Sequence, residues 1–517
     1  MNTNQIFWCN SCSIPLLSSR CELCKTEGKT FVTDLKPVFP EELKIYSNVL
    51  PGIGNLSFTT PTNFFRFRNK IFGNGKVLFS FYINGNELKF DVKNKYHCNE
   101  PLPIKQILHA NRRKLEKRED EAIKFIRKVA KQHKDKHVLV SFSGGKDSSV
   151  TAYLVHKALG KVTLVFSNTG IEFPETVKFV REFARKMKFD LVELNPPKNF
   201  FEICNELGPP SRMMRWCCFT QKSTPINDYY ATLDKPILSF DGIRKAESKS
   251  RAKFEKIRKN TKIIKQYSAY PIFDWSDFEV WLYILWKKLP INPLYYYGFS
   301  RVGCFVCPNN GKFDEFLLKR IHPELYKEWE KILVSYASKN GKTLDWVYNG
   351  EWKQRKTKYK KFEVCTIQNT CTVGNKFVFI LNGHKVTENL LEFFKVFGKK
   401  NKKISNGETF IQFIGSDILI SAIVGDKTIR VKINDGKKLN RKLFEVTKQL
   451  EKALNCINCG GCIGSCPYGA IKINNNKFMI DETKCRHCLT CITSKYIKQA
   501  CISLHYKPIR NVVNFNL

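Results

Sequence analysis

The sequence lacks long hydrophobic runs. The longest apolar stretches, such as the segment from Val280 to Trp286, fall well short of the ~18 residues that a membrane-spanning helix needs. The first residues, MNTNQIFWCNSC, also lack the basic and then apolar pattern of a secretory signal peptide. We therefore expect a cytoplasmic protein without a membrane partner.

Acidic residues are scarce relative to basic ones. The chain has 47 Asp and Glu against 87 Lys and Arg, which leaves a formal net charge of +40. Such an excess favours polyanionic partners such as nucleotides or RNA. Because the basic residues are spread along the whole chain, solvated lysine-rich surfaces explain the excess equally well, and RNA stays a possible partner.

Cysteine, by contrast, is abundant. The 20 cysteines occur mostly in close pairs and triplets, in a large chain without an export signal. This arrangement favours metal and cluster ligation in a reducing compartment over a disulfide framework.

A chain of 517 residues is too long to fold around a single hydrophobic core, because a domain averages roughly 150 residues. We predict a multidomain α/β protein. Its expected parts are a zinc ribbon (1–30), a β-rich accessory module (31–104), a charged helical connector (105–135), a nucleotide-binding domain (136–350), a small α+β module (362–450) and a two-cluster ferredoxin domain (451–517).

The central segment alternates short apolar runs with helical patterns. HVLVSFSGG, KVTLVFSNTG and KFDLVELN read as strands, and the two stretches between them read as helices. This βαβαβ order predicts a doubly wound parallel sheet. In the accessory module, Lys76–Ile83 and Glu87–Val92 predict a hairpin that turns at Asn84-Gly85.

A glycine-rich loop, SFSGGKDSS, joins the first of these strands to its helix. Two glycines let backbone N–H groups approach a phosphate, the helix N-terminus adds partial positive charge, and a lysine adds a full one. The spacing differs from the GxxxxGK[ST] loop. The candidate nucleotide-binding residues here are Ser141, Ser143, Gly144, Gly145, Lys146, Asp147, Ser148 and Ser149.

The SGGKDS motif resembles the pyrophosphatase loop of ATP pyrophosphatases and of phosphoadenosine phosphosulfate reductases. NTGIEFPET (168–176), FDGIRKAESKSR (240–251), PIFDWSDFEVWLYI and NPLYYYGFSRVGCFVCP extend the resemblance to the reductase branch over roughly residues 137–330. The resemblance adds Thr169, Gly170 and Gly242 as nucleotide-binding residues. It also implies that Arg244 pairs with a phosphate or sulfate. The family usually has Asp where this chain has Asn168.

Four cysteines of this domain, Cys217, Cys218, Cys304 and Cys307, suffice for a [4Fe–4S] cluster or a tetrahedral zinc ion. Their Cys-Cys…Cys-x2-Cys spacing resembles the cluster-bearing adenylyl-sulfate reductases. That resemblance favours a [4Fe–4S] cluster over zinc.

The C-terminal cysteines have the spacing of a bacterial ferredoxin with two [4Fe–4S] clusters. In such proteins the fourth cysteine of each run ligates the other cluster. We therefore assign one cluster to Cys456, Cys459, Cys462 and Cys501, and the second to Cys466, Cys485, Cys488 and Cys491. The nine residues between Cys491 and Cys501 depart from the compact spacing.

At the N-terminus two close pairs, Cys9-x2-Cys12 and Cys21-x2-Cys24, resemble a short zinc ribbon. Two pairs on knuckle turns can form a tetrahedral Cys₄ site, so we expect a structural zinc rather than a redox iron. In total, the sequence predicts three [4Fe–4S] clusters, one zinc and an adenine nucleotide as substrate.

The resemblance implies reduction of adenylyl sulfate or phosphoadenylyl sulfate to sulfite, with electrons from the fused ferredoxin and an external donor to it. One alternative is an ATP-dependent, adenylating sulfurtransferase acting on tRNA. Another is an electron-transfer or assembly subunit whose central domain only binds nucleotide, although the intact Lys146 and Asp147 favour an active domain.

The reductase family carries its nucleophile in a C-terminal Glu-Cys-Gly-x-His motif, which this sequence lacks. Cysteines assigned to metal are poor nucleophiles, and this leaves Cys98, Cys204, Cys365 and Cys371. Because the family places its catalytic tail after the core domain, we predict Cys365 or Cys371 as the attacking thiolate.

Overall fold

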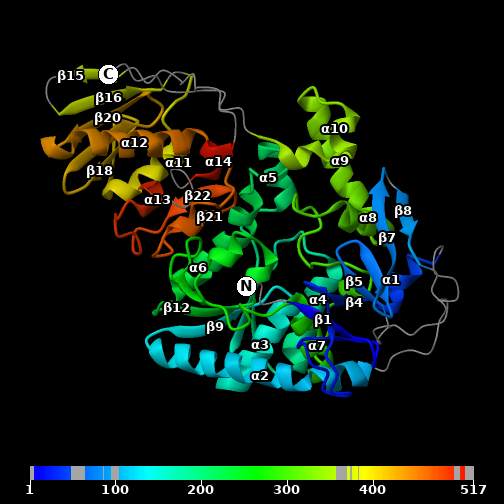
Figure 1. Cartoon of the computed structure of the whole chain (residues 1–517). Coiled ribbons are helices and arrows are strands. Elements are labelled where there is room, and N and C mark those ends of the chain that lie inside the picture. The colour runs from blue at the N-terminus through cyan, green and yellow to red at the C-terminus, as the bar shows by residue number, and fades with distance from the viewer. Residues whose placement is uncertain are drawn as a thin grey trace.

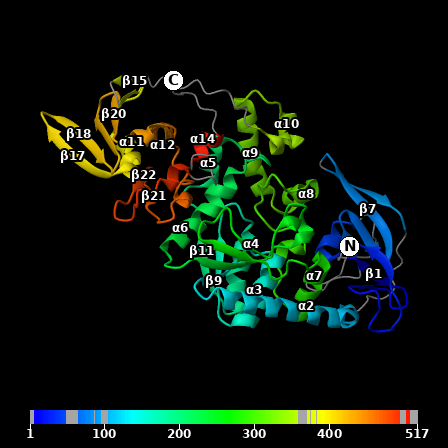
Figure 2. The ribbon, with the colours of Figure 1, turned by 60° about the vertical axis from the view of Figure 1, so that its left-hand side comes forward.

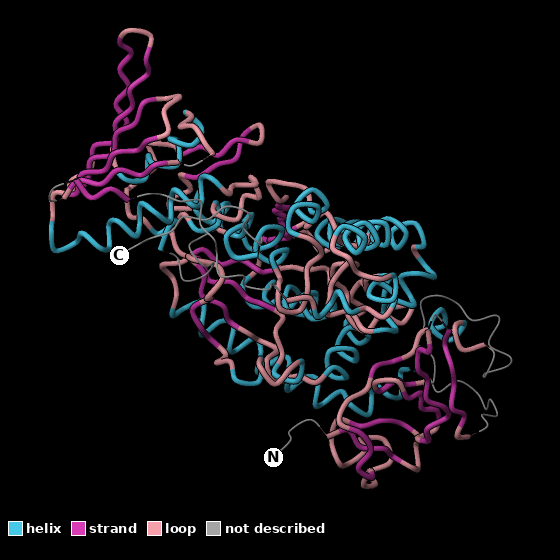
Figure 3. The backbone as a smooth tube through the Cα atoms, turned by 90° about the horizontal axis from the view of Figure 1, so that it is seen from above, coloured by secondary structure: helices cyan, strands magenta, loops and turns pink. Residues whose placement is uncertain are grey.

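The computed structural model describes residues 5–47, 64–85, 87–94, 104–356, 369–372, 375–381, 383–493 and 501–506. A large α/β domain occupies the centre, and two sets of smaller modules flank it (Figure 1). Seen from above, the strand-rich modules lie at opposite ends of the helix-rich centre (Figure 3).

The central domain contains a six-stranded sheet of order β11-β10-β9-β12-β14-β13. All neighbouring pairs are parallel except β13 and β14, so the predicted parallel sheet is confirmed and its edge strand is the exception. Only six residues connect β13 to β14, and a parallel crossover needs a dozen or more. The strands are β9 (His137–Ser141), β10 (Thr163–Ser167), β11 (Asp190–Leu194), β12 (Ile237–Asp241), β13 (Ile257–Lys259) and β14 (Gln266–Ala269).

Strand order reverses on either side of β9, because β10 lies on one side and β12 on the other. Ligands of open α/β sheets bind outside the carboxyl ends of the strands at such a reversal. The helices of the domain are α3 (Lys146–Leu159), α4 (Pro174–Lys186), α5 (Phe200–Leu207), α6 (Thr224–Thr232), α7 (Asp277–Lys287), α8 (Lys312–Ile321), α9 (Pro323–Lys339) and α10 (Leu344–Tyr348).

The segment predicted as a connector forms the long helix α2 (Ile104–Gln132), which packs along α3 and α7. Its apolar stripe includes Leu115 and Ile126, both fully buried in the main core. The carboxylate of Glu119 accepts from Tyr283 and pairs with two lysines. The helix is therefore part of the central domain's core as well as a link between modules.

The N-terminal segment forms two antiparallel sheets. One has the order β2-β1-β3 and the other β4-β5-β6-β7-β8. The predicted hairpin is present, with Asn84 opposite Glu87, so its loop begins one residue later than expected. The elements are β1 (Ile6–Cys9), β2 (Ile14–Leu16), β3 (Lys29–Val32), β4 (Lys36–Pro37), α1 (Pro40–Lys44), β5 (Phe65–Phe67), β6 (Lys70–Gly73), β7 (Lys76–Asn84) and β8 (Glu87–Val92).

The C-terminal part combines an antiparallel sheet of order β15-β16-β20-β19-β18-β17 with a cysteine-rich unit that contains the β21-β22 hairpin. Both lie on the same flank of the central domain (Figure 2). The elements are β15 (Asn369–Thr372), β16 (Lys376–Ile380), α11 (Glu388–Glu392), β17 (Lys399–Ser405), β18 (Glu408–Ile414), β19 (Ile418–Ile423), β20 (Thr428–Ile433), α12 (Leu439–Leu454), β21 (Ile471–Asn474), β22 (Lys477–Ile480), α13 (Thr490–Thr493) and α14 (Ile502–Tyr506).

Across the described residues, no helix combines the length and apolarity required to cross a membrane.

Candidate functional site

The glycine-rich loop connects β9 to α3 at the carboxyl edge of the sheet. Gly144 has a φ of +71°, a conformation that favours glycine. A Cβ at this position would also lie 2.9 Å from Val180 Cγ2. Gly145 is the N-cap of α3, whose first turn begins at Lys146. The loop therefore directs the N-terminus of a 14-residue helix toward this edge.

Two side chains from the segment after α7 hold this loop in place. Asn292 Nδ2 donates to Gly144 O at 3.1 Å and to Thr176 Oγ1 at 3.2 Å. The Lys146 N–H donates to the Tyr295 hydroxyl at 3.1 Å. The sequence pattern gives neither residue a role, although both belong to the NPLYYYGFSRVGCFVCP segment that supports the resemblance.

The serines of the loop bond mainly to the loop itself. Ser148 Oγ donates to Gly145 O at 2.8 Å and accepts from the Ser143 N–H at 3.3 Å. Ser149 Oγ donates to the same carbonyl, and Ser141 Oγ lies 2.8 Å from Ser239 Oγ. These bonds stabilise the turn that presents the helix N-terminus.

A buried cluster of four charges lies beside the loop. Lys146 Nζ lies 2.7 Å from Asp147 Oδ2 and 2.8 Å from Asp277 Oδ1. Arg244 reaches the same two carboxylates, at 2.5 Å from Nε and 2.6 Å from Nη2. Burial opposes ionisation of Asp147, but the two cations outweigh it and lower its pKa to about 2. In this structure both cations are neutralised by carboxylates, and their contacts to a phosphate or sulfate stay predictions.

Gly242 makes this cluster possible by letting β12 approach α3. A Cβ on Gly242 would lie 2.6 Å from the carbonyl carbon of Asp147. The Gly-x-Arg segment therefore needs its glycine for close packing, and that packing brings Arg244 to Asp147.

One further acid at this cluster comes from the N-terminal segment and was missed by sequence analysis. The Asp34 carboxylate accepts from the N–H groups of Asp277 at 3.1 Å and Phe278 at 3.0 Å, at the start of α7. Burial and the charge of Asp277 raise the pKa of Asp34 to about 6. No motif surrounds Asp34, so only the fold reveals its location.

The four central cysteines come together at the same edge. Cys218 begins a π-helix, Cys218–Ser223, and Cys217 is its N-cap; the Cys304 segment pairs with Glu172. The thiol of Cys217 interacts electrostatically with those of the other three, Cys218, Cys304 and Cys307. A [4Fe–4S] cluster holds its ligands farther apart than a single ion, because each sulfur binds a different iron. Among the described residues only the N-terminal cysteines are close enough together for a single ion, so the central set fits a cluster better.

The loop after β10 places this cysteine set beside the glycine-rich loop. Cys304 Sγ lies 3.8 Å from Thr169 Oγ1 and 3.5 Å from Glu172 Oε1. The Gly170 N–H donates to Asn168 Oδ1, and Asn168 Nδ2 donates to Glu193. Because β9 and β10 are parallel neighbours, the loops that follow them meet at one edge.

Cations surround the cysteine set. Arg215 Nη2 lies 3.3 Å from Cys218 Sγ. Lys222, on the π-helix, acts electrostatically on Cys218 and Glu172, and Arg301 also acts on Glu172. All three side chains are exposed. The sequence pattern does not single them out, because isolated cations in a basic chain carry no signal of their own.

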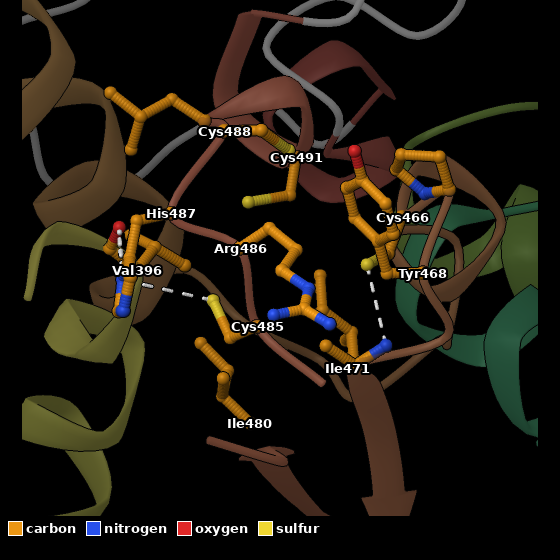
Figure 4. A pocket seen from close by; sticks show the side chains of 13 residues that line it. Val396, Cys466, Tyr468, Ile471, Ile480, Cys485, Arg486, His487, Cys488 and Cys491 are labelled. Atoms are coloured by element: carbon orange, nitrogen blue, oxygen red, sulfur yellow. Dashed lines mark hydrogen bonds between the residues drawn. The ribbon is translucent and has the colours of Figure 1, made fainter. Parts of the chain in front are cut away.

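In the C-terminal unit, the four cysteines assigned to the second ferredoxin cluster line one pocket. Figure 4 shows the sulfurs of Cys466, Cys485 and Cys491 around a shared space, and Cys488 completes the set. The Ala470 N–H donates to Cys466 Sγ at 3.3 Å. Four thiols with backbone donors around one pocket fit a [4Fe–4S] cluster.

The cysteines assigned to the first cluster also gather. The thiol of Cys459 interacts electrostatically with Cys456, Cys462 and Cys501, and Cys459, Cys462 and Cys501 are buried. The Asn458 N–H donates to Cys456 Sγ at 3.3 Å. Cys501, which is distant in sequence, therefore lies with Cys456, Cys459 and Cys462, the set to which its spacing assigned it.

The N-terminal set is the most compact. The sulfurs of Cys9, Cys12, Cys21 and Cys24 all lie within 4.8 Å of one another. The Cys12 N–H donates to Cys9 Sγ at 3.4 Å, as in a knuckle turn. Four thiols this close can bind a single tetrahedral ion, and zinc is the ion such sites hold most often.

The remaining cysteines differ in location. Cys204, on α5, is 2% exposed, and burial raises its pKa to about 12, so it is a thiol of the core. Cys98 and Cys365 lie outside the described residues. Cys371 pairs through its backbone with Phe377 in β16, and β15 lies across the molecule from α3 (Figures 1 and 2).

Comparison with known proteins identifies the central domain. Residues 137–310 match the model of the phosphoadenosine phosphosulfate reductase domain. The chain is 40% identical over 283 residues to an uncharacterized protein of Methanocaldococcus jannaschii; the match covers 54% of this chain and 58% of that protein, so the chain spans less than two thirds of that relative's length.

An adenosine 5′-phosphosulfate reductase of Staphylococcus epidermidis is 28% identical over 35% of this chain and 74% of its own length. Among solved structures, a phosphoadenylyl-sulfate reductase of Candida auris aligns with a TM-score of 0.28 and 19% identity, over 35% of this chain and 87% of that one. The family match assigns residues 137–310 to the phosphoadenosine phosphosulfate reductase domain type, within a longer, multi-module chain.

Proposed function

We propose that this chain reduces adenylyl sulfate or phosphoadenylyl sulfate to sulfite, with electrons that enter through the C-terminal cysteine unit. The observation that carries the proposal is the meeting of the glycine-rich loop and the central cysteine set at one edge of the sheet. The domain match and the adenosine 5′-phosphosulfate reductase relatives support the substrate class.

The loop would bind the phosphate groups. Its N–H groups lie at the N-terminus of α3, where the helix dipole favours anions. The sulfate would lie toward the central cysteines, where Arg215, Lys222 and Arg301 supply positive charge. This arrangement would hold the two ends of an adenylyl sulfate over neighbouring parallel strands.

The reaction would follow two balanced steps. A cysteine thiolate attacks the sulfur of the activated sulfate, an S–S bond forms, and the sulfur–oxygen bond breaks with its electron pair on the leaving nucleoside monophosphate. Two electrons then cleave the S–S bond, releasing sulfite and restoring the thiolate. An external low-potential one-electron donor supplies them, and bound [4Fe–4S] clusters would pass on one electron at a time.

The attacking thiolate is proposed to be Cys365 or Cys371. The backbone of Cys371 is held in β15 by its pairing with β16. Cys365 lies in the segment between β15 and the short 3₁₀ helix Glu351–Gln354, which is anchored to the central domain through Lys353 Nζ and Asn310 O at 3.1 Å. Because reaching the loop would cost Cys371 its strand pairing, we favour Cys365.

Docking of the C-terminal unit on the central domain supports its role as electron donor. The 3₁₀ helix Ile463–Ser465, next to Cys462, packs on α6, which continues the π-helix that begins at Cys218. A Cβ on Gly464 would lie 3.0 Å from Thr224 Cα. Lys198 Nζ donates to Ile457 O at 3.1 Å. The C-terminal cysteines and the central set are thus connected by one short helical segment.

Anaerobically purified, cluster-loaded protein should be mixed with adenylyl sulfate or phosphoadenylyl sulfate and reduced methyl viologen. We expect stoichiometric sulfite and nucleoside monophosphate. Without reductant, mass spectrometry of the quenched protein should find an SO₃ increment on the peptide that contains Cys365 or Cys371. Absence of sulfite with both nucleotides would overturn the proposal.

A second candidate is an ATP-dependent, adenylating sulfurtransferase acting on tRNA. The net charge of +40 and the exposed cations around the central cysteines favour it. The same preparation should then consume ATP only when tRNA is present and form no S-sulfo adduct. This outcome separates the two candidates in one set of assays.

A further inference from the structure

One lysine of α12 lies deep within the C-terminal unit. Lys452 is 2% exposed, although lysine is among the residues least often buried. It occupies the last turn of α12, which packs against both α13 and α14. These short helices carry or adjoin Cys491 and Cys501, one cysteine from each predicted ferredoxin set.

Among the residues that the structure describes, the side chain of Lys452 has no acidic partner. Lys452 Nζ donates to Cys491 O at 3.2 Å and lies 5.6 Å from the centre of the Phe478 ring. Within the described part of the chain, no Asp or Glu lies within ion-pair distance of Lys452. Lys442 and Lys448 on the same helix do have acidic partners, at 3.6 Å and 2.8 Å.

A buried ammonium with a single carbonyl partner is unfavourable. Removal of such an ion from water is costly even after relaxation, and one hydrogen bond does not offset that cost. The buried charge of Lys452 therefore requires an anionic environment other than carboxylate.

Cysteine sulfurs form that environment. The thiols of Cys462, Cys491, Cys501 and Cys456 act electrostatically on Lys452. Cys491 belongs to one predicted set and the other three belong to the other, so the ammonium lies between the two.

We propose that Lys452 is a shared counter-cation of the two ferredoxin clusters. Each reduced cluster carries one more negative charge than its oxidised form. A fixed positive charge between the sets therefore stabilises the reduced forms and raises both reduction potentials. This role does not depend on the reaction of the nucleotide-binding domain.

The test compares three variants of the full-length, cluster-loaded protein by potentiometric titration with electron paramagnetic resonance. Lys452→Met and Lys452→Gln remove the charge, and the glutamine keeps a donor for Cys491 O. Lys452→Arg keeps the charge. Lys448→Met, one turn earlier on α12, is the matched control.

We expect both midpoint potentials to become more negative in the two neutral variants. They should stay near the wild-type values in Lys452→Arg and Lys448→Met. If the neutral variants lose iron while Lys452→Arg retains it, the charge is needed to hold the clusters, and the proposal stands.

Three results would overturn it: unchanged potentials in an iron-replete neutral variant, a shift of only one potential, or iron loss in Lys452→Arg as well. The last would mean that Lys452 acts through packing alone.

Discussion

The buried cations beside the glycine-rich loop and in the C-terminal unit are neutralised in different ways. Lys146 and Arg244 share the carboxylates of Asp147 and Asp277 at 2.5–2.8 Å. Lys452 instead donates to a backbone carbonyl and lies in the electrostatic field of cysteine sulfurs. The charges beside the glycine-rich loop are therefore balanced by carboxylate side chains of the protein. The charge of Lys452 is balanced only when the cysteines are thiolates, and cysteines are thiolates when they bind metal.

The largest effect is expected at the carboxylate-balanced cluster. Arg244→Ala leaves Asp147 and Asp277 with one cation fewer in a buried site, which should lower the free energy of unfolding by about 3–5 kcal/mol. Denaturant titration followed by tryptophan fluorescence measures it. Arg181→Ala, which removes an exposed pair with Glu193, is the control and should change little.

The comparison also predicts how these effects depend on metal. The cost of Arg244→Ala should be the same in iron-loaded and iron-depleted protein. The effect of Lys452→Gln on stability should differ between those states. Equal effects of Lys452→Gln in both would break the contrast between the two sites.

A pH-dependent effect is expected from Asp34. Its pKa is raised to about 6 from an ordinary value of 3.8, so the folded protein binds a proton there more tightly than the unfolded chain. The contribution of Asp34 to the free energy of unfolding is therefore fully present below about pH 4 and is lost as the pH rises through about 6. Relative to wild type, Asp34→Asn should gain up to about 3 kcal/mol of unfolding free energy between pH 4 and 7. A difference that does not change with pH would contradict this environment for Asp34.

Lys146→Ala tests whether a cation already paired with carboxylates still serves a nucleotide. We expect adenine nucleotide affinity to fall by about one to two decades, because a charged contact is worth about 1.5–3 kcal/mol. Cluster content should be unchanged. Calorimetric titration measures the affinity, and Lys157→Ala, whose lysine pairs with Glu119 on α2, is the control. Unchanged affinity would confine Lys146 to a structural role.

The smallest effect is expected at the contact between the C-terminal unit and α6. Gly464→Val places side-chain atoms against Thr224 and should weaken the docking by about 1–3 kcal/mol. Sulfite formation with reduced viologen should slow, while nucleotide affinity and iron content stay unchanged. Gly436→Val is the matched control, because a Cβ there meets no atom within 4 Å. Equal rates in both variants would argue against electron delivery through this contact.

Local patterns were sufficient for much of the molecule. Alternating apolar runs predicted β9, β10 and β11 and the helices between them, because a strand or helix period is a property of neighbouring residues. Glycine spacing marked the loop at Gly144, since few other residues adopt its φ of +71°. The four cysteine sets also followed from spacing, and the structure brings each set together.

Other features depend on residues far apart in the chain. Asp34 meets Asp277 across 243 positions, and Asn292 meets Gly144 across 148. Lys452 resembles its neighbours Lys442 and Lys448 in sequence, and only its packing between α13 and α14 removes it from water. Sequence alone determined which cysteines form close sets and where a glycine-rich loop would begin a helix, because these follow from local spacing and backbone geometry. Tertiary structure decided which charges are buried and what neutralises them, because burial and partners are set by elements that pack together only in the fold.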